Sequence, residues 1–488
     1  MMNLGLLESL LRSRTWRVGR NGVAVNDVHS HLNQVRVHRV VTPTCLESIS
    51  PLINEANAEG RAISIAGGRH AMGGQQFGED TILIDTHRMK RVLNFDPENG
   101  LIEVEAGIRW PDLIAYLDWR QRDQWPQWGI RQKQTGADRL SIGGALSANV
   151  HGRGLRFKPF VEDIESINLI DARGKVLTCS RQENSDLFKL AIGGYGLFGV
   201  IGSVKLRLVQ RTKVQRCVQL VEIEDLIDLI EKRIVDGFLY GDFQFSIAPE
   251  SDDFLRRGVC SCYGPVGDRG DIPAKQKELS ARNWKHLFFL AHVNKQRAFE
   301  EYSSYYLSTN GQRYWSDQHQ LSEYVDDYHG DLDRRLWPSQ HGTEMISEIF
   351  VPREALVSFM DEVRRDFRQN GVNLIYGTIR FIEKDEESFL PWAKQRFACI
   401  IFNLHTEHTP RALEKTAGDF RRLIDRALRY GGSYYLTYHR WASRSQVETC
   451  YPRFVEFLRL KKHYDPEERF QSEWYRHYKK MFADALRL

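Results

Sequence analysis

The sequence predicts an α+β protein of two domains. Its 488 residues exceed what one hydrophobic core usually organises. Short strand-like segments alternate with short helices up to about residue 210, and the helical segments become longer after residue 212. From about residue 431 the pattern returns to a short strand and a basic helix. We therefore expect an N-terminal extension (1–33), a first domain (34–211), a second domain inserted after it (212–430), and a C-terminal segment (431–488) that returns to the first domain.

The elements of the first domain follow from apolar periodicity and from turn residues. Pro51 falls inside the first expected helix and predicts a kink, and Gly60 marks the end of that helix. The expected elements, in chain order, are a helix over 46–56, strands over 62–66, 81–85 and 101–106, a helix beginning at Pro111, a hairpin of strands 164–170 and 176–179, a helix over 185–191 and a strand over 200–208.

Composition excludes several classes of protein. The 68 basic and 64 acidic residues are interspersed and leave a net charge of +4, so nothing indicates a nucleic-acid partner. The seven cysteines are scattered and favour reduced thiols in a cytoplasmic protein. No apolar run approaches the roughly 18 residues of a membrane span. Residues 1–12 resemble a signal peptide only superficially, because Glu8 interrupts the apolar stretch. We expect a short amphipathic helix there, and contact with a membrane surface is left open as one interpretation of it.

Two glycine-rich segments carry most of the functional information. Residues 63–75 and 141–152 are each interpreted as a glycine-rich turn at the end of an apolar strand-like segment. Glycine adopts positive φ and has no Cβ, so two such turns let backbone N–H groups surround a diphosphate. His70 lies at the apex of the first turn. Together the turns predict a bound flavin dinucleotide.

A third glycine pattern, Gly194-x-Gly196-x-x-Gly199, matches the fingerprint of nicotinamide cofactor sites but lies in the wrong context. That fingerprint requires a strand before the glycines and a helix after them. Here a helix precedes them and a strand follows. We interpret these glycines as a tight helix-to-strand turn.

In their order along the chain, these motifs resemble the flavoprotein family that includes vanillyl-alcohol oxidase and p-cresol methylhydroxylase (PCMH). The resemblance covers residues 34–210 well and 464–470 more loosely, and is nearest to the sugar-lactone, alditol and decaprenylphosphoryl-ribose oxidases. It implies a two-part PCMH-type FAD-binding domain. It also implies an inserted substrate (cap) domain, built on an antiparallel sheet with flanking helices.

The resemblance also implies which residues contact FAD. Members of the family often bond the histidine of the first turn covalently to the flavin, and His70 stands at that position, where a noncovalent hydrogen bond is the alternative. His151 is interpreted as a turn residue beside the cofactor. The expected cofactor-binding residues are Gly67, Gly68, Arg69, His70, Gly73, Gly74, Ser141, Gly143, Gly144, Ser147, Asn149, Ile201 and Val204.

Three residues resemble the catalytic groups of the family: Glu348, Arg380 and His439. Glu348 or His439 is expected to take up a hydroxyl proton, and Arg380 to offset the charge of reduced flavin. Relatives that oxidise sugar lactones carry a lysine after the histidine in a His-Trp-Gly-Lys motif. The segment after His439 lacks that lysine, which leaves the substrate class open.

Each of these assignments has a structural alternative. Glu348 is also compatible with a solvent-facing carboxylate, and Arg380 with an ion pair to Glu383 or Asp385. No metal site is expected. No third ligand is evident near His405 and His408, so we interpret both as structural histidines, and we interpret His29 and His31 as structural histidines too. The aromatic stretch 302–315 suits either a mobile loop over the substrate or a packed surface segment.

The resulting hypothesis is an FAD-dependent oxidoreductase that moves a hydride from a hydroxyl-bearing carbon to flavin N5. The substrate would be small and polar: a sugar, a polyol or a sugar-phosphate lipid. A reductase of carbon–carbon double bonds of the sterol Δ24 type and a noncatalytic flavin-binding electron-transfer subunit are the alternatives. A carbohydrate-binding module without flavin is the remaining one.

Overall fold

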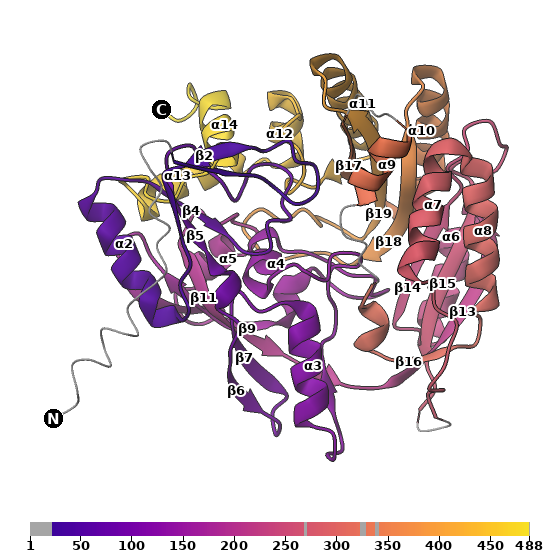
Figure 1. Ribbon diagram of the computed structural model, residues 1–488, viewed down its shortest axis with the longest axis horizontal. Helices are drawn as coiled ribbons and strands as arrows, with labels where there is room; N and C mark the ends of the chain where they lie inside the picture. The colour runs from indigo at the N-terminus through magenta and orange to yellow at the C-terminus, as the bar shows by residue number, and fades with distance from the viewer. Residues whose placement is uncertain (1–21, 268–270, 323–327, 337–340, 488) are drawn as a thin grey trace.

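The computed structural model describes residues 22–267, 271–322, 328–336 and 341–487. Several small sheets from the first half of the chain occupy the left of Figure 1, and one large sheet with its helices occupies the right. One continuous hydrophobic core contains residues from both halves, from Ile102 to Phe482. The helix expected over 1–12 lies outside the described residues.

The first half contains two main sheets. A parallel sheet has the order β3 (Arg39–Val41), β5 (Ile82–Asp85), β4 (Ile63–Ala66), and helix α2 (Ile49–Ala58) packs against it. An antiparallel sheet has the order β10 (Val176–Ser180), β9 (Ile164–Ile170), β11 (Val200–Arg207), β7 (Leu101–Glu105), β6 (Val92–Asp96). Its helices are α3 (Trp110–Arg120), α4 (Ile142–Ala148) and α5 (Ser185–Ala191). Two small ribbons are β1 (Val23–Val25) with β2 (Val35–Val37), and β8 (Trp128–Gly129) with β12 (Val209–Gln210).

Most of the expected elements of this half are confirmed, and two details are wrong. The helix expected over 46–56 begins as a 3₁₀ turn, η1 (Leu46–Ser48), and continues as α2. Pro51 therefore falls in the first turn of α2, where the backbone N–H needs no intrahelical acceptor, and it produces no mid-helix kink. The second glycine turn is the start of helix α4, and no strand precedes it directly.

The second half is built on an eight-stranded antiparallel sheet in the order β16-β13-β15-β14-β18-β19-β17-β20. Its strands are β13 (Lys213–Glu222), β14 (Tyr240–Phe245), β15 (Arg257–Pro265), β16 (Arg313–Trp315), β17 (Gly342–Pro352), β18 (Leu374–Ile382), β19 (Phe397–Glu407) and β20 (Ser433–Tyr434). The helices around it are α6 (Ile223–Val235), α7 (Ala281–Val293), α8 (Lys295–Ser308), α9 (Tyr328–Leu336), α10 (Leu356–Asn370) and α11 (Pro410–Arg429).

The aromatic stretch 302–315 belongs to packed secondary structure. Its first part lies in α8, which packs against β13 and β15, and its last part is β16. The interpretation as a loop over the substrate is therefore wrong, because these aromatic side chains pack on the sheet.

The C-terminal segment contains α12 (Arg444–Cys450), α13 (Phe454–Tyr464) and α14 (Glu473–Met481), drawn in yellow beside β4 and β5 in Figure 1. Phe470 forms a parallel bridge with Ile63 at the edge of β4. The Ile63 N–H donates to the Arg469 carbonyl, and the Gln471 N–H donates to the Ile63 carbonyl at 2.8 Å. The end of the chain thus completes the parallel sheet of the first half.

Two global properties complete the description. All seven cysteines are free thiols. Within the described ranges, none of the helices combines the length and apolar character needed to cross a bilayer.

Candidate cofactor and active site

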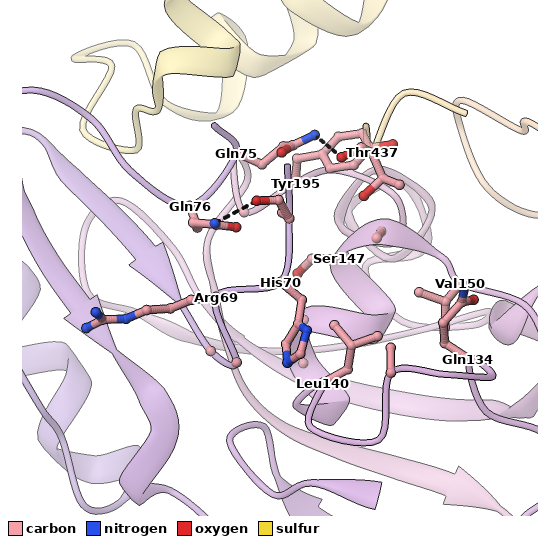
Figure 2. Close-up of a pocket in the computed structure, with 18 of the residues that line it drawn as sticks. Arg69, His70, Gln75, Gln76, Gln134, Leu140, Ser147, Val150, Tyr195 and Thr437 are labelled. Carbon is pink, nitrogen blue, oxygen red and sulfur yellow. Dashed lines mark hydrogen bonds between the residues drawn. The ribbon is translucent and has the colours of Figure 1, made fainter. Parts of the chain in front are cut away.

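A cavity of about 1250 Å³, part of it open to solvent, lies between the first glycine turn, helix α4 and the segment that follows β20. Segments that are far apart in the sequence therefore form one site. Figure 2 shows His70, Ser147 and Thr437, one from each of these segments, and Leu140 from the loop before α4. The expected cofactor-binding residues that line it are Gly67, Gly68, Arg69, His70, Gly143, Gly144, Ser147 and Ile201.

The first glycine turn requires its glycines for close packing. A Cβ on Gly67 would lie 2.1 Å from the Ser141 hydroxyl oxygen, and a Cβ on Gly68 would lie 2.4 Å from the Arg139 carbonyl oxygen. Arg69 follows with φ of 58°, in the left-handed region. Among the backbone hydrogen bonds of the described residues, none uses the N–H groups of Gly67, Gly68, Arg69 or His70. This turn therefore offers unpaired donors beside the cavity, which suits an anionic group.

The second glycine segment contributes differently from the expectation. Its backbone donors are already used, because Ile142 donates to Ile108, Gly143 donates to Ala106 at 2.8 Å, and Gly144 donates to the side chain of Ser141 at 3.2 Å. Gly143 and Gly144 still line the cavity. Their role is thus to let a ligand approach the backbone closely, and the N–H donors come from the first turn.

Five expected cofactor-binding residues do not line the cavity. Ser141 caps α4, and Asn149 ends that helix and donates to Asp385 at 3.0 Å. Val204 pairs with Val104 and Ile167 in the centre of the antiparallel sheet, fully buried. The remaining two are Gly73 and Gly74. A Cβ added to Gly73 would meet Tyr438 and Gln75, and a Cβ added to Gly74 would meet Glu473 and Arg440.

His70 forms a pair with His29, which also lines the cavity. The His70 Nδ1 and the His29 Nε2 lie 2.7 Å apart, so one imidazole donates a hydrogen bond to the other. Burial, followed by the neighbouring His29 and Arg109, holds the pKa of His70 well below its ordinary value. His70 is therefore a neutral imidazole at physiological pH.

Arg69 is directed away from His70 in Figure 2. Its guanidinium donates to the Asp85 carboxylate at 2.6 Å, and Asp85 also accepts from His87 at 2.8 Å. Asp85 is the last residue of β5, next to the turn. The ion pair therefore fixes the left-handed Arg69 backbone, whereas the guanidinium itself is engaged within the protein.

Glu348, on β17, belongs to a buried polar group and is not solvent-facing. Glu348 and His151 are both fully buried, and the Oε1 of Glu348 contacts the His151 Nε2. The His151 Nδ1 donates to the Gly152 carbonyl at 3.0 Å, so one proton is shared between Nε2 and the carboxylate. The Tyr438 hydroxyl donates to the other carboxylate oxygen at 3.2 Å, and Tyr438 lines the cavity. His151 thus has a larger role than a turn residue.

Arg380 is buried on the same face of the sheet as Glu348. Glu348 on β17 lies opposite Ile401 on β19, and Ile401 lies opposite Thr378 on β18. Arg380 is two residues after Thr378 on β18, so its side chain points to that same face. Its Nε and Nη1 atoms have no hydrogen-bond partner within the described part of the chain. The expected alternatives do not apply, since Glu383 pairs with Arg353 and Arg396. A buried guanidinium with unused donors indicates an anionic or oxygen-rich ligand.

His439 is buried but does not line the cavity. Its ring stacks on Trp441 with centroids 4.6 Å apart, and burial lowers its pKa to about 3. Its neighbour Tyr438 lines the cavity instead and contacts Glu348. Tyr438 was not singled out in the sequence, where tyrosines are frequent throughout this segment.

Other residues of the site were missed or misjudged from the sequence. Tyr195, Gly196 and Gly199 line the cavity, although the glycines do form the expected helix-to-strand turn between α5 and β11. The loop of residues 134–140 also contributes, and the only signal there is its Gly136. Lys133, before this loop, is fully buried against Asp138, and burial lowers its pKa to about 8.

The residues present fit a flavin dinucleotide. The first turn, α4 and the segment after β20 line the cavity together, and the first turn offers unpaired backbone donors next to a glycine cradle. Tyr438 also lines the cavity and connects it to Glu348. An anionic diphosphate suits the donors of the first turn, and a reacting group suits the wall at Tyr438.

Comparison with known proteins agrees with this geometry. Residues 37–180 match the family described as FAD binding domain. This range contains both glycine segments and ends inside β10.

Similar curated proteins include L-gulono-1,4-lactone dehydrogenase of Mycobacterium tuberculosis, 24% identical over 90% of this chain and 95% of that protein. L-gulonolactone oxidase of Bos taurus is 25% identical over 39% of this chain and 42% of that protein. D-arabinono-1,4-lactone oxidase of Yarrowia lipolytica is 25% identical over 43% of this chain and 40% of that protein. The chain thus spans less than half of the last two relatives.

Proposed function

We propose that the chain is an FAD-linked oxidoreductase of the PCMH-type family, in its sugar-lactone oxidase branch, and that it oxidises a hydroxyl-bearing carbon of a small sugar-like molecule. The observation that carries the proposal is the buried group of Glu348, His151 and Tyr438, which reaches the cavity through Tyr438. The relatives are named for sugar lactones, so a sugar lactone is the first substrate class to examine.

The residues that would hold FAD are those that line the cavity at the first turn and at α4. The N–H groups of residues 67–70 would bind the diphosphate, and Gly143 and Gly144 would let it approach the start of α4. When bound, FAD supplies the two-electron acceptor for a hydride.

Tyr438 and Glu348 would accept the proton that the substrate hydroxyl loses. Tyr438 lines the cavity, and its hydroxyl donates to the Glu348 carboxylate at 3.2 Å. As Tyr438 takes a proton from the substrate, it would pass one to Glu348. His151 shares a proton with the other carboxylate oxygen and stabilises its charge.

Arg380 would supply positive charge beside this group. Burial and the Glu348 carboxylate raise the pKa of Tyr438, whereas Arg380 opposes that rise, so the guanidinium lies close enough to act on the same hydroxyl. Its unused donors would bind a substrate oxygen or offset the negative charge that develops during the reaction.

The test is anaerobic reduction of the protein-bound flavin, followed by its visible absorbance. L-gulono-1,4-lactone, D-arabinono-1,4-lactone and a sugar alcohol are each mixed with the protein, and NADPH is mixed in a parallel sample. Bleaching by a hydroxyl compound supports the proposal. Bleaching by NADPH together with no response to any hydroxyl compound would instead favour the double-bond reductase.

We also propose His70 as the attachment point of a covalently bound flavin. The neutral imidazole of His70 lies in the cavity wall, and the hydrogen bond between its Nδ1 and His29 orients the ring. Acid precipitation of the purified protein should leave yellow colour in the pellet, and His70→Ala should release it. His87→Ala is the control, because His87 lies near the turn and bonds Asp85 but does not line the cavity. Colour that stays in the supernatant of the unmodified protein would contradict the covalent bond.

A further inference from the structure

A cluster of three histidines surrounds one carboxylate in the second half of the molecule, outside the cavity. Glu344 lies on β17 directly opposite His405 on β19. His292 comes from the last turn of α7, and His329 is the second residue of α9. These elements meet in the upper right of Figure 1. His292, Glu344 and His405 thus each offer a ligand atom within 4.8 Å of the other two, and His329 contacts Glu344 from a fourth element.

The distances within the cluster match a coordination sphere. The His292 Nε2 lies 3.2 Å from Glu344 Oε1, and the His405 Nδ1 lies 3.8 Å from the same oxygen. The His329 Nε2 contacts Oε2. With metal–ligand bonds of about 2.0–2.2 Å, the ligand atoms of a tetrahedral site lie about 3.3–3.6 Å apart. The 3.8 Å separation is too long for a hydrogen bond but near the edge of such a tetrahedron.

Burial and charge also favour a cation. The side chains of Glu344, His292 and His405 are 5%, 1% and 6% exposed, and His329 is 22% exposed. A buried carboxylate beside imidazole nitrogens is an environment that suits a cation. As metal ligands, two imidazoles and one carboxylate carry a net charge of −1, which a divalent cation converts to +1.

We propose that His292, Glu344 and His405 bind one divalent transition-metal ion, with Zn²⁺ as the best match, and that His329 orients Glu344 through the second carboxylate oxygen. Imidazole nitrogen and carboxylate oxygen are typical zinc ligands, and a second partner on a ligating carboxylate is typical of metal sites. The ion ties α7 to the two longest strands of the sheet.

The site also lies behind the wall of the cavity. Thr343, next to Glu344, donates its hydroxyl hydrogen to the His29 carbonyl at 3.3 Å, and His29 pairs with His70. The metal therefore supports the segment that orients His70. The proposal itself depends only on His292, Glu344, His405 and the contact of His329 with Glu344, and it is independent of the reaction that the enzyme catalyses.

The experiment uses tag-free, full-length flavoprotein that has been treated with a chelator and dialysed. Zn²⁺ binding is measured by elemental analysis and by competition with a chromogenic chelator, and Co²⁺ is added to a second sample to record its visible spectrum. We expect one Zn²⁺ per chain, a spectrum typical of tetrahedral Co²⁺, and a higher unfolding temperature with Zn²⁺ than without.

Two variants and one control test the ligand assignment. Glu344→Gln alters a direct ligand and keeps the shape of the side chain, and His329→Ala removes only the partner of its second oxygen. Because replacing an outer partner of a metal ligand costs about 10–100-fold in affinity, His329→Ala should weaken Zn²⁺ binding by about that factor and Glu344→Gln by at least about 100-fold. His408→Ala, three residues from His405 and exposed, should bind Zn²⁺ like the unmodified protein.

The bound flavin spectrum shows whether each variant is folded. Absence of a tight Zn²⁺ or Co²⁺ site in the unmodified protein would overturn the proposal. So would equal Zn²⁺ affinity in folded His329→Ala, Glu344→Gln and His408→Ala proteins, since the metal would then bind elsewhere.

Discussion

Replacing Glu348 separates its chemical role from its structural role. Glu348→Gln preserves the shape of the side chain but removes its ability to accept a proton. Its amide oxygen still accepts from Tyr438 and its amide nitrogen donates to the His151 Nε2, the two contacts that Glu348 makes in the structure. Glu348→Ala removes both contacts.

The expected magnitudes differ strongly between the two variants. In Glu348→Ala, the buried His151 loses its charged partner, which costs about 3–5 kcal/mol of unfolding free energy. In Glu348→Gln, both hydrogen bonds are retained and the cost is about 1 kcal/mol. If Glu348 is the final proton acceptor, Glu348→Gln lowers the rate of flavin reduction by about 10²–10⁴-fold.

The assay has two parts. Urea unfolding at constant protein and flavin concentration gives the stability of each variant relative to the unmodified protein. Stopped-flow mixing with the active substrate under anaerobic conditions gives the rate of flavin reduction, and the flavin content of each sample normalises that rate. Tyr438→Phe is measured in parallel, because it interrupts the path from the cavity to Glu348 without removing the carboxylate.

A Glu348→Gln protein that reduces its flavin at the unmodified rate would refute the proton-acceptor role. A Glu348→Ala protein as stable as the unmodified one would refute the reasoning about the buried pair. Slow reduction by Glu348→Gln together with normal reduction by Tyr438→Phe would show that the substrate reaches Glu348 by another path.

Three further predictions concern cofactor binding and stability. Gly68→Ala places a methyl group 2.4 Å from a backbone carbonyl oxygen, so the purified protein should contain less flavin than Gly418→Ala, whose added Cβ meets only one side-chain nitrogen at 3.8 Å. Lys461 and Asp465 are a buried ion pair, so Lys461→Met should lower the unfolding free energy by about 3–5 kcal/mol, and adding Asp465→Asn should recover part of that loss. Burial lowers the pKa of His439 from 6.5 to about 3, so the unfolded state binds the proton first as the pH falls. Between pH 6.5 and 5 this costs about 2 kcal/mol of unfolding free energy, and His439→Asn should lose correspondingly less over that interval.

Local patterns predicted local structure well. Strands β5 and β9 and the turn before β10 were predicted from the sequence. Each is determined by residues that are adjacent in the chain, and such local patterns are visible in a single sequence. The glycines at 67 and 68 were found for the same reason, because a tight turn needs residues without a Cβ. Backbone hydrogen bonding decides which glycine segment can offer donors to a ligand. The N–H groups at the start of α4 are bonded within the protein, whereas those of the first turn are not.

The parts that sequence reasoning missed depend on contacts between distant residues. His151 and Glu348 are 197 positions apart, and only the packing of the large sheet against α4 brings them together. In the proposed metal site, Glu344 is likewise distant from His405 in the sequence and reaches it only as a cross-strand neighbour. Strand register, which a single sequence does not reveal, decides both cases.

The bridge between Ile63 and Phe470 has a consequence for biosynthesis. A ribosome releases the first half of this polypeptide long before residue 470 is translated, so the nascent parallel sheet exposes an unpaired edge for most of that time. Flavin loading that needs this sheet complete therefore waits until residue 470 has been translated. A polypeptide that stops before residue 470 would leave that edge of the parallel sheet unpaired.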